Sequence, residues 1–397
     1  MKKALIAAAV AGAFVAPTAM AAEGPSVNIY YPMAIVMGDT ETNNGAESTA
    51  DETVRDGGGS RLMFTWTDQL NNGMSLTAYA SFGNLGHSEA GGVNTRNSFI
   101  ALNGDHGSLA MGTMEHFFEI DAITDGYGAD WALNGTAAGG EGLNFQRIGR
   151  TGFNFTRRDT NSVWWTGPQM NNLQLRAAYI MGPDATANDA TDPEGYQIGA
   201  IYSMGGLNMR VAHASYDDYA ADGTAGGAAN VIDQNADNLT AGDIIAGGAT
   251  IAGSNAEGTQ FIFGYDFGSF NASVGLISME QSFSGNTIET SGYFASFIMP
   301  VEGGRIILNL GELGDQDVNS QALRDSGISG LDIGYQHDLS ANTYTFVRYQ
   351  TQETGANFDD NGRTNAAIGG AQGNAIDTTG DVDSDSSSFM AGIVFSY

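Results

Sequence analysis

The chain has 397 residues, no cysteine, and 45 acidic against 15 basic residues, which gives a formal net charge of −30. The absence of cysteine excludes a disulfide-stabilised fold, and the acidic balance argues against binding nucleic acid or an anionic membrane surface through basic patches. We therefore expect no nucleic-acid partner.

Residues 1–21 are predicted to be a secretory signal peptide. Lys2 and Lys3 precede an apolar run over 4–15, and Ala19-Met20-Ala21 forms a small-residue cleavage site. That run is too short for a membrane-spanning helix, and no later stretch reaches the roughly eighteen continuous apolar residues that one needs. Residues 22–397 are predicted to form one domain, which contains thirteen arginines and no lysine.

From residue 27 onward, runs of eight to eleven residues with alternating polarity are separated by breaks that are short and long in turn. The short breaks are rich in Gly, Asn, Asp and Pro, as tight turns require, and lie at 67–73, 103–106, 167–172, 203–206, 267–269, 300–304 and 338–342. The long breaks lie at 37–59, 83–94, 114–160, 182–195, 217–258, 280–291, 312–326 and 353–386.

Seven short and eight long breaks separate sixteen predicted strands. An even strand number with short turns at one end and long loops at the other is typical of a bacterial outer-membrane barrel, in which a closed sheet leaves no backbone group unpaired in lipid. The predicted fold class is therefore all-β: a transmembrane antiparallel β-barrel with short periplasmic turns and long extracellular loops.

The strands also separate side chains by face. In 61–67, Leu62, Phe64 and Trp66 share one face, whereas Arg61 lies on the other. A charged group on the lipid face at mid-bilayer costs about 2 to 4 kcal/mol, so the strand arginines are predicted to face the lumen. By the same parity, the further lumen candidates are Arg176, Arg210, Arg305 and Arg348, for which pairing with neighbouring acids such as Asp332 is an equally good role.

The longest break, 114–160, lies between two strands with clear alternation, 107–113 and 161–166. It is too long for an ordinary connection in a compact domain. Its charges are largely sorted along the chain. Acids come first, at Glu115, Glu119, Asp121, Asp125, Asp130 and Glu141, and the bases Arg147, Arg150, Arg157 and Arg158 follow. The segment is either a solvated surface loop or a loop folded into a pore, with its acids facing basic residues.

The last strand, 389–397, alternates to its final aromatic residue. The chain resembles the Gram-negative general porins, which are trimeric sixteen-stranded barrels. The stretches that carry the resemblance, in chain order, are 27–30, 60–64, 95–102, 107–112, 161–165 and this last strand. Gly392, Phe395 and Tyr397 look like the carboxyl-terminal signal that the barrel-assembly machinery of these proteins reads.

The resemblance implies an outer-membrane homotrimer in contact with lipid and lipopolysaccharide, through which ions and small hydrophilic solutes diffuse passively. It also implies that the third loop folds into the lumen, where its carboxylates face wall arginines at the narrowest point. The matching wall positions are Arg61, Arg96, Arg157 and Arg158, and the loop positions are Glu115, Glu119, Asp121 and Asp125.

The chain departs from the family pattern at the constriction. Thr113 stands where many relatives have an arginine, and Pro32 and Met33 stand where some carry a first-strand lysine. A less basic constriction and the overall acidity together favour mild cation selectivity.

Neither catalysis nor a cofactor is predicted. His213 near Asp217 and Asp218 is the nearest approach to a catalytic dyad, but aspartates just beyond a strand end are more often loop residues. The acidic run 381–385 opens like a calcium-binding loop and then has Ser386 and Gly392 where such a loop needs Gly and Glu, so no metal site is expected.

The sequence is also compatible with two alternatives to a general diffusion channel. One is a substrate-selective porin with the same barrel and a binding track in the lumen. The other is a non-conducting surface adhesin or structural barrel whose long acidic loops bind a partner.

Overall fold

The computed structural model describes residues 25–42, 47–56, 60–83, 85, 93–121, 147–148, 153–154, 158–181, 194–219, 229–232, 244–247, 254–283, 286–323, 327–354 and 384–397. The predicted signal peptide lies outside these residues. Among them no helix is long and apolar enough to cross a membrane.

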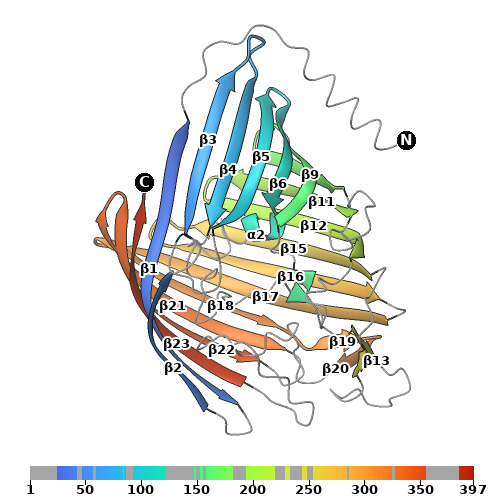
Figure 1. The fold of residues 1–397 in the computed structure, drawn as a ribbon, viewed down its shortest axis with the longest axis vertical. Helices are drawn as coiled ribbons and strands as arrows, with labels where there is room; N and C mark the ends of the chain where they lie inside the picture. The colour runs from blue at the N-terminus through green and yellow to red at the C-terminus, as the bar shows by residue number, and fades with distance from the viewer. Residues whose placement is uncertain are drawn as a thin grey trace.

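In the described part of the chain, sixteen antiparallel strands form one closed ring (Figure 1). In ring order they are β1 (Ser26–Thr42), β3 (Arg61–Gln69), β4 (Ser75–Gly83), β5 (Asn94–Gly104), β6 (Gly107–Glu115), β9 (Arg158–Thr166), β10 (Leu173–Ile180), β11 (Glu194–Met204), β12 (Leu207–Tyr219), β15 (Ser254–Asp266), β16 (Asn271–Phe283), β17 (Asn286–Val301), β18 (Gly304–Leu313), β21 (Ile328–Ser340), β22 (Thr343–Thr354) and β23 (Ser384–Ser396). The predicted sixteen-stranded barrel is confirmed.

The ring closes between its first and last strands. β1 pairs with β23 from Tyr30 opposite Ser396 to Thr42 opposite Ser384. Beyond this ladder, the Ile29 amide donates to the Tyr397 carbonyl at 2.7 Å and the Tyr397 amide donates back at 2.9 Å. The sheet therefore has no free edge at which backbone groups would lack partners.

All seven predicted tight turns occur between neighbouring strands of the barrel. Gly73 and Gly268 have φ values of 81° and 80° in two of these turns, a left-handed conformation that glycine adopts without strain. The connections at the other end hold the remaining short elements: β2 (Glu47–Asp56), α2 (Phe117–Asp121), β7 (Arg147–Ile148), β8 (Phe153–Asn154), β13 (Ala229–Ile232), β14 (Ile244–Gly247), β19 (Gln316–Val318) and β20 (Gln321–Leu323).

Two predicted long loops are wrong. The described residues of 280–291 all lie in strands, since β16 reaches Phe283 and β17 begins at Asn286. Most of 37–59 is a hairpin in which the extended end of β1 pairs with β2. In both places the strands continue beyond the apolar belt of the barrel into polar sequence. A polar sequence there predicts a loop, although the backbone remains paired in the sheet.

Side chains alternate between an exposed outward face and a covered lumen face. On β3, Phe64 and Trp66 are 36% and 50% exposed on the outward face, as predicted. On β16, Leu276 is 55% exposed and the adjacent Ile277 only 3%. The outward face presents the apolar side chains that a lipid surface requires.

Several large lumen-facing side chains lie over glycines of the neighbouring strand. Gly275 is the cross-strand partner of Phe294, and a Cβ added to Gly275 would lie 1.9 Å from that ring. A Cβ on Gly292 would similarly meet the Leu313 side chain at 2.8 Å. These glycines make room for bulky residues inside the barrel without widening the sheet.

We predict that Gly275→Ala destabilises the barrel by about 1 to 3 kcal/mol, because the added methyl group forces the Phe294 ring from its position. Gly264→Ala is the matched control, since its Cβ would have ordinary contacts, the nearest being the Ser273 Cβ at 3.6 Å. Denaturant titration followed by the electrophoretic mobility of the folded barrel measures both variants. Equal stability of the two would contradict this account of packing.

Candidate functional site

The chain turns inward directly after β6. Glu115 ends that strand, His116 follows, and the short helix α2 (Phe117–Asp121) lies inside the ring of strands (Figure 1). Phe117 and Phe118 are fully covered. The expected entry of the third loop into the lumen begins here.

Two glutamines on the barrel wall hold the first residues of α2 by their backbone. The Oε1 of Gln197, on β11, accepts a hydrogen bond from the Phe117 amide at 2.8 Å. The Nε2 of Gln260, on β15, donates to the Phe118 carbonyl at 3.2 Å. A helix this short leaves most of its backbone groups without a partner in the helix, and the wall provides two of the missing partners.

An ionic clamp fixes the last residue of the helix. One oxygen of Asp121 lies 2.5 Å from Arg176 on β10 and the other lies 3.2 Å from Arg210 on β12. The side chains are 1%, 5% and 10% exposed, respectively. Because these groups are shielded from water, loss of one partner costs far more than it would at the surface.

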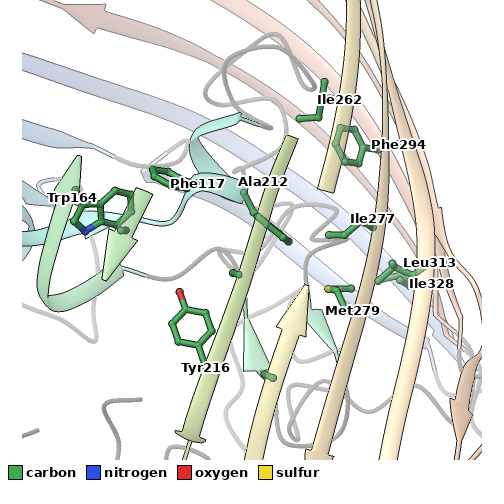
Figure 2. Packing of buried hydrophobic residues seen from close by; sticks show 14 of the residues in the cluster. Phe117, Trp164, Ala212, Tyr216, Ile262, Ile277, Met279, Phe294, Leu313 and Ile328 are labelled. Carbon is green, nitrogen blue, oxygen red and sulfur yellow. The ribbon is translucent and has the colours of Figure 1, made fainter. Parts of the chain in front are cut away.

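Apolar contacts complete the attachment of α2. The Phe117 ring packs edge-on against Trp164 of β9, with ring centroids 4.7 Å apart (Figure 2). On another side, the Arg176 guanidinium carbon lies 4.3 Å from the centroid of the Phe117 ring. Arg176 thus binds α2 both by charge and by a cation–π contact.

Gln197 is itself held by a buried acid. Its Nε2 donates to Asp159 Oδ2 on β9, and the hydroxyl of Tyr216 on β12 donates to the same oxygen at 3.0 Å. The wall is therefore cross-linked by polar groups at the place where α2 docks, and this orients the amide that receives Phe117.

A second charged group lies at the junction of β6 and α2. Glu115 and Arg158 are direct cross-strand partners, and Arg158 Nη2 lies 2.8 Å from Glu115 Oε1. The Nη2 of Arg96 lies 3.7 Å from the same oxygen. Arg158 also donates through Nε to Asn97 at 3.1 Å.

Arg61 contributes to this group more distantly. Its guanidinium stacks over the Tyr30 ring at 5.2 Å from the centroid, and its charge acts favourably on the Glu115 carboxylate. We use the name Glu115 cluster for Glu115, Arg61, Arg96 and Arg158.

The structure thus brings together four of the predicted constriction residues in the Glu115 cluster and places Asp121 elsewhere. Asp121 contacts Arg176 and Arg210, because the turn of α2 carries it past the Glu115 cluster toward β10 and β12. Asp125, Arg157 and the side chain of Glu119 lie outside the part of the chain that the structure describes.

The remaining parity candidates have structural partners. Arg348 Nε lies 2.7 Å from Asp332, the pairing considered from sequence, and Arg305 Nε donates to Gln336 at 3.0 Å. His213 faces outward, where its Nδ1 lies 3.0 Å from the Thr259 hydroxyl. In the described ranges no group of three or more His, Asp or Glu side chains could hold a metal ion.

The proposed assembly-signal residues divide between the two faces of β23. Phe395 and Tyr397 are exposed on the outward face, whereas Gly392 faces the lumen beneath Phe346. Their recognition by an assembly machinery stays a prediction.

The model of a family described as Gram-negative porin matches residues 6–357. This chain belongs to the Gram-negative porin family. As a porin it is located in the outer membrane, where family and fold support a channel for solute diffusion. The porin family and fold are non-enzymatic in general.

Solved porin-like structures share the fold at low sequence identity. An anion-selective porin from Comamonas acidovorans superposes with a TM-score of 0.65 at 16% identity, over 94% of this chain and 99% of that one. OmpT of Vibrio cholerae gives 0.61 at 13% identity, over 96% and 100%. Salmonella typhi OmpF in complex with daunomycin gives 0.56 at 12% identity, over 94% and 97%. The porin matches no curated protein sequence.

We predict that Asp121→Asn loosens α2. Removing the carboxylate charge shared by Arg176 and Arg210 costs about 3 to 5 kcal/mol of local docking free energy. Single-channel recording should show a larger mean conductance and greater open-channel noise. The control is Asp105→Asn in an exposed turn, and wild-type conductance and noise in Asp121→Asn would contradict the clamp.

Proposed function

We propose that this porin forms a water-filled channel for passive diffusion of ions and small hydrophilic solutes, narrowed where the chain turns inward at Glu115. The observation that carries this proposal is the Glu115 cluster: arginines from β5 and β9 meet a carboxylate at the base of the segment that enters the lumen. A sixteen-stranded barrel is wide enough to enclose water, and α2 takes up part of that space.

Opposed charges beside an aqueous path create a transverse field. In the low-dielectric surroundings of a barrel wall, such a field orients dipolar solutes and biases the passage of ions. Glu115 is held between Arg96 and Arg158 at the end of β6. The cluster is therefore the part of the described lumen best suited to act on a passing solute.

Mild cation selectivity is the preference that the whole-chain charge supports. The net charge of −30 raises the local concentration of cations near the pore mouths. The solved relative from Comamonas acidovorans is named as anion-selective, and the acidity of this chain is the reason for proposing the opposite preference here.

The proposed assembly is a homotrimer embedded in outer-membrane lipid and lipopolysaccharide and inserted by the barrel-assembly machinery. One structure of Vibrio cholerae OmpT is described as a trimer form, and this porin shares its fold. We also propose that the chain acts without catalysis, because the porin family to which it belongs is non-enzymatic in general.

Two substitutions of opposite sign test the Glu115 cluster. Glu115→Gln removes a negative charge and should shift the reversal potential in a KCl gradient toward anion preference. Arg96→Gln removes a positive charge from the same cluster and should shift it toward cation preference. Shifts in the same direction, or no shift in either variant, would contradict the proposed constriction.

A liposome-swelling assay tests passive diffusion directly. Uncharged sugars of increasing size should enter liposomes containing the wild-type protein at rates that fall steeply with size. Empty liposomes supply the control. Rates no higher than that control for even the smallest sugar would contradict a diffusion channel.

A further inference from the structure

A row of aromatic rings continues from β15 through the turn 267–270 to β17. The rings of Tyr265 and Phe267 have centroids 4.7 Å apart, and those of Phe267 and Phe270 are stacked at 4.5 Å. The Phe270 ring in turn lies 4.9 Å from that of Phe297. We call these four residues the aromatic turn cluster. Connections between strands are normally polar because they lie in water, yet Phe267 is 54% exposed in this one.

The aromatic turn cluster lies on the lipid-facing side of the wall. Tyr265 is exposed on the outward face of β15. Phe297 has the same parity on β17 as the exposed Tyr293. The charged residue beside the turn, Asp266, has the opposite parity and shares the lumen face of β15 with the buried Ile262. The turn therefore extends the two-faced pattern of the strands beyond their last paired residues.

Two backbone amides of the turn are satisfied without water. The Phe267 amide donates to the Phe270 carbonyl at 2.9 Å, and the Gly268 amide donates to Asp266 Oδ1 at 2.7 Å. A turn with internal partners loses less than an open one when it enters the membrane interface, where fewer water molecules are available as partners. This backbone is suited to the interface, with its rings directed toward the acyl chains.

The apolar surface above the turn is shorter than the membrane requires. On β15 the outward apolar residues run from Phe261 to Tyr265, which is about 14 Å along the strand and roughly 10 Å across the membrane at the usual tilt. The next outward residues are Thr259 and Glu257, which are exposed. Since an outer-membrane barrel presents an apolar band about 25 Å tall, this sector lacks apolar height.

Three carboxylates set the upper limit of the apolar surface here. Glu280 on β16 is the cross-strand partner of Glu257 on one side and of Glu289 on the other. Carboxylates require water, so the sector cannot gain height by drawing them into the membrane. On β23, by contrast, the outward apolar residues run from Phe389 to Tyr397, about 27 Å along the strand.

We propose that the aromatic turn cluster is inserted in the inner leaflet of the outer membrane, surrounded by phospholipid head groups and the upper parts of acyl chains. The cluster adds one outward level below Tyr265, and so extends the apolar band at the end that the carboxylates do not limit. Burial of the exposed rings in lipid is favourable, and aromatic rings suit the membrane interface. Phospholipid is the partner because the cluster is continuous with the outward face that lipid covers.

Other turns at this end of the barrel lack such a surface. The turn 300–304, in the neighbouring hairpin, carries the exposed Glu302, and the turn 103–106 carries the exposed Asp105 and His106. Charged turns are expected to stay in water, so insertion should be specific to the turn 267–270. This inference rests on the outer-membrane location of the family and goes beyond the proposed channel function.

Fluorescence from a label in the turn tests the insertion, and the chain has no native cysteine to interfere. Ser269→Cys carries a polarity-sensitive fluorophore and leaves all four rings in place. Glu302→Cys in the neighbouring turn is the matched control. Both variants are placed in dioleoylphosphatidylcholine nanodiscs, which leave both membrane faces open to the buffer, after the electrophoretic mobility of the folded barrel is verified. Phe267→Cys supplies a second label position if Ser269→Cys does not fold.

The label at Ser269→Cys should emit at shorter wavelength than the control, and iodide in the buffer should quench it at least about threefold more weakly. Phospholipid with a nitroxide near the top of its acyl chain should quench it more strongly than the control. In Ser269→Cys/Phe267→Ala/Phe270→Ala both differences should be lost, because the rings that hold the turn in lipid are absent.

Two results would overturn the proposal. Equal iodide quenching at Ser269→Cys and Glu302→Cys would place the turn in water. Protection from iodide without quenching by the nitroxide lipid would indicate that a protein surface, and not phospholipid, covers the turn. Neither readout measures ion flux, so failure of this inference is distinguishable from failure of the proposed channel.

Discussion

The constraint on which the structure depends is that every backbone N–H and C=O inside the hydrocarbon must find a partner in the protein. This chain meets it by joining β23 to β1 along thirteen register positions, with Ile29 and Tyr397 exchanging two further hydrogen bonds. Once the sheet is closed, the wall supplies its own backbone partners. Lumen side chains are then free to serve other purposes.

The wall arginines illustrate this freedom. Arg96 and Arg158 surround Glu115 where the chain leaves β6, and Arg176 and Arg210 hold Asp121 six residues further along the chain. The first pair lies beside the proposed water path and the second is buried beneath α2. Lumen arginines with the same strand parity therefore have different roles: some lie at the proposed constriction and others hold α2. Only their acidic partners distinguish these two roles.

The sequence was sufficient to predict the strands of the barrel wall and the faces of their side chains. It was insufficient to predict the contacts made inside the lumen. Strand parity placed Arg61 and Arg176 inward and Phe64 outward, because the period of two is fixed by the backbone itself. It could not show that Asp121 reaches Arg176, because this depends on a helical turn after Glu115 that only five residues encode. Nor did it single out Gln197 and Gln260. Strand parity predicts that their side chains face the lumen, but no feature of the neighbouring sequence predicts that they form hydrogen bonds with the backbone of α2.

The missed strands have a related cause. Between 280 and 291 the residues are mostly polar, and the ladder nevertheless continues, with Glu280 opposite Glu289. Outside the membrane a strand needs no apolar face, so the pattern that reveals strands inside lipid disappears while the hydrogen bonds persist. Strand ends in such barrels are consequently harder to predict than strand number.

In the proposed channel, a closed barrel encloses a continuous water path that an anchored inward segment narrows. Ion current through the purified wild-type protein in a planar bilayer under a salt gradient tests it most directly. We predict stepwise current increments and a reversal potential on the cation side. Absence of current from correctly folded barrel would contradict the water path, and a reversal potential on the anion side would contradict the assignment of charge along it.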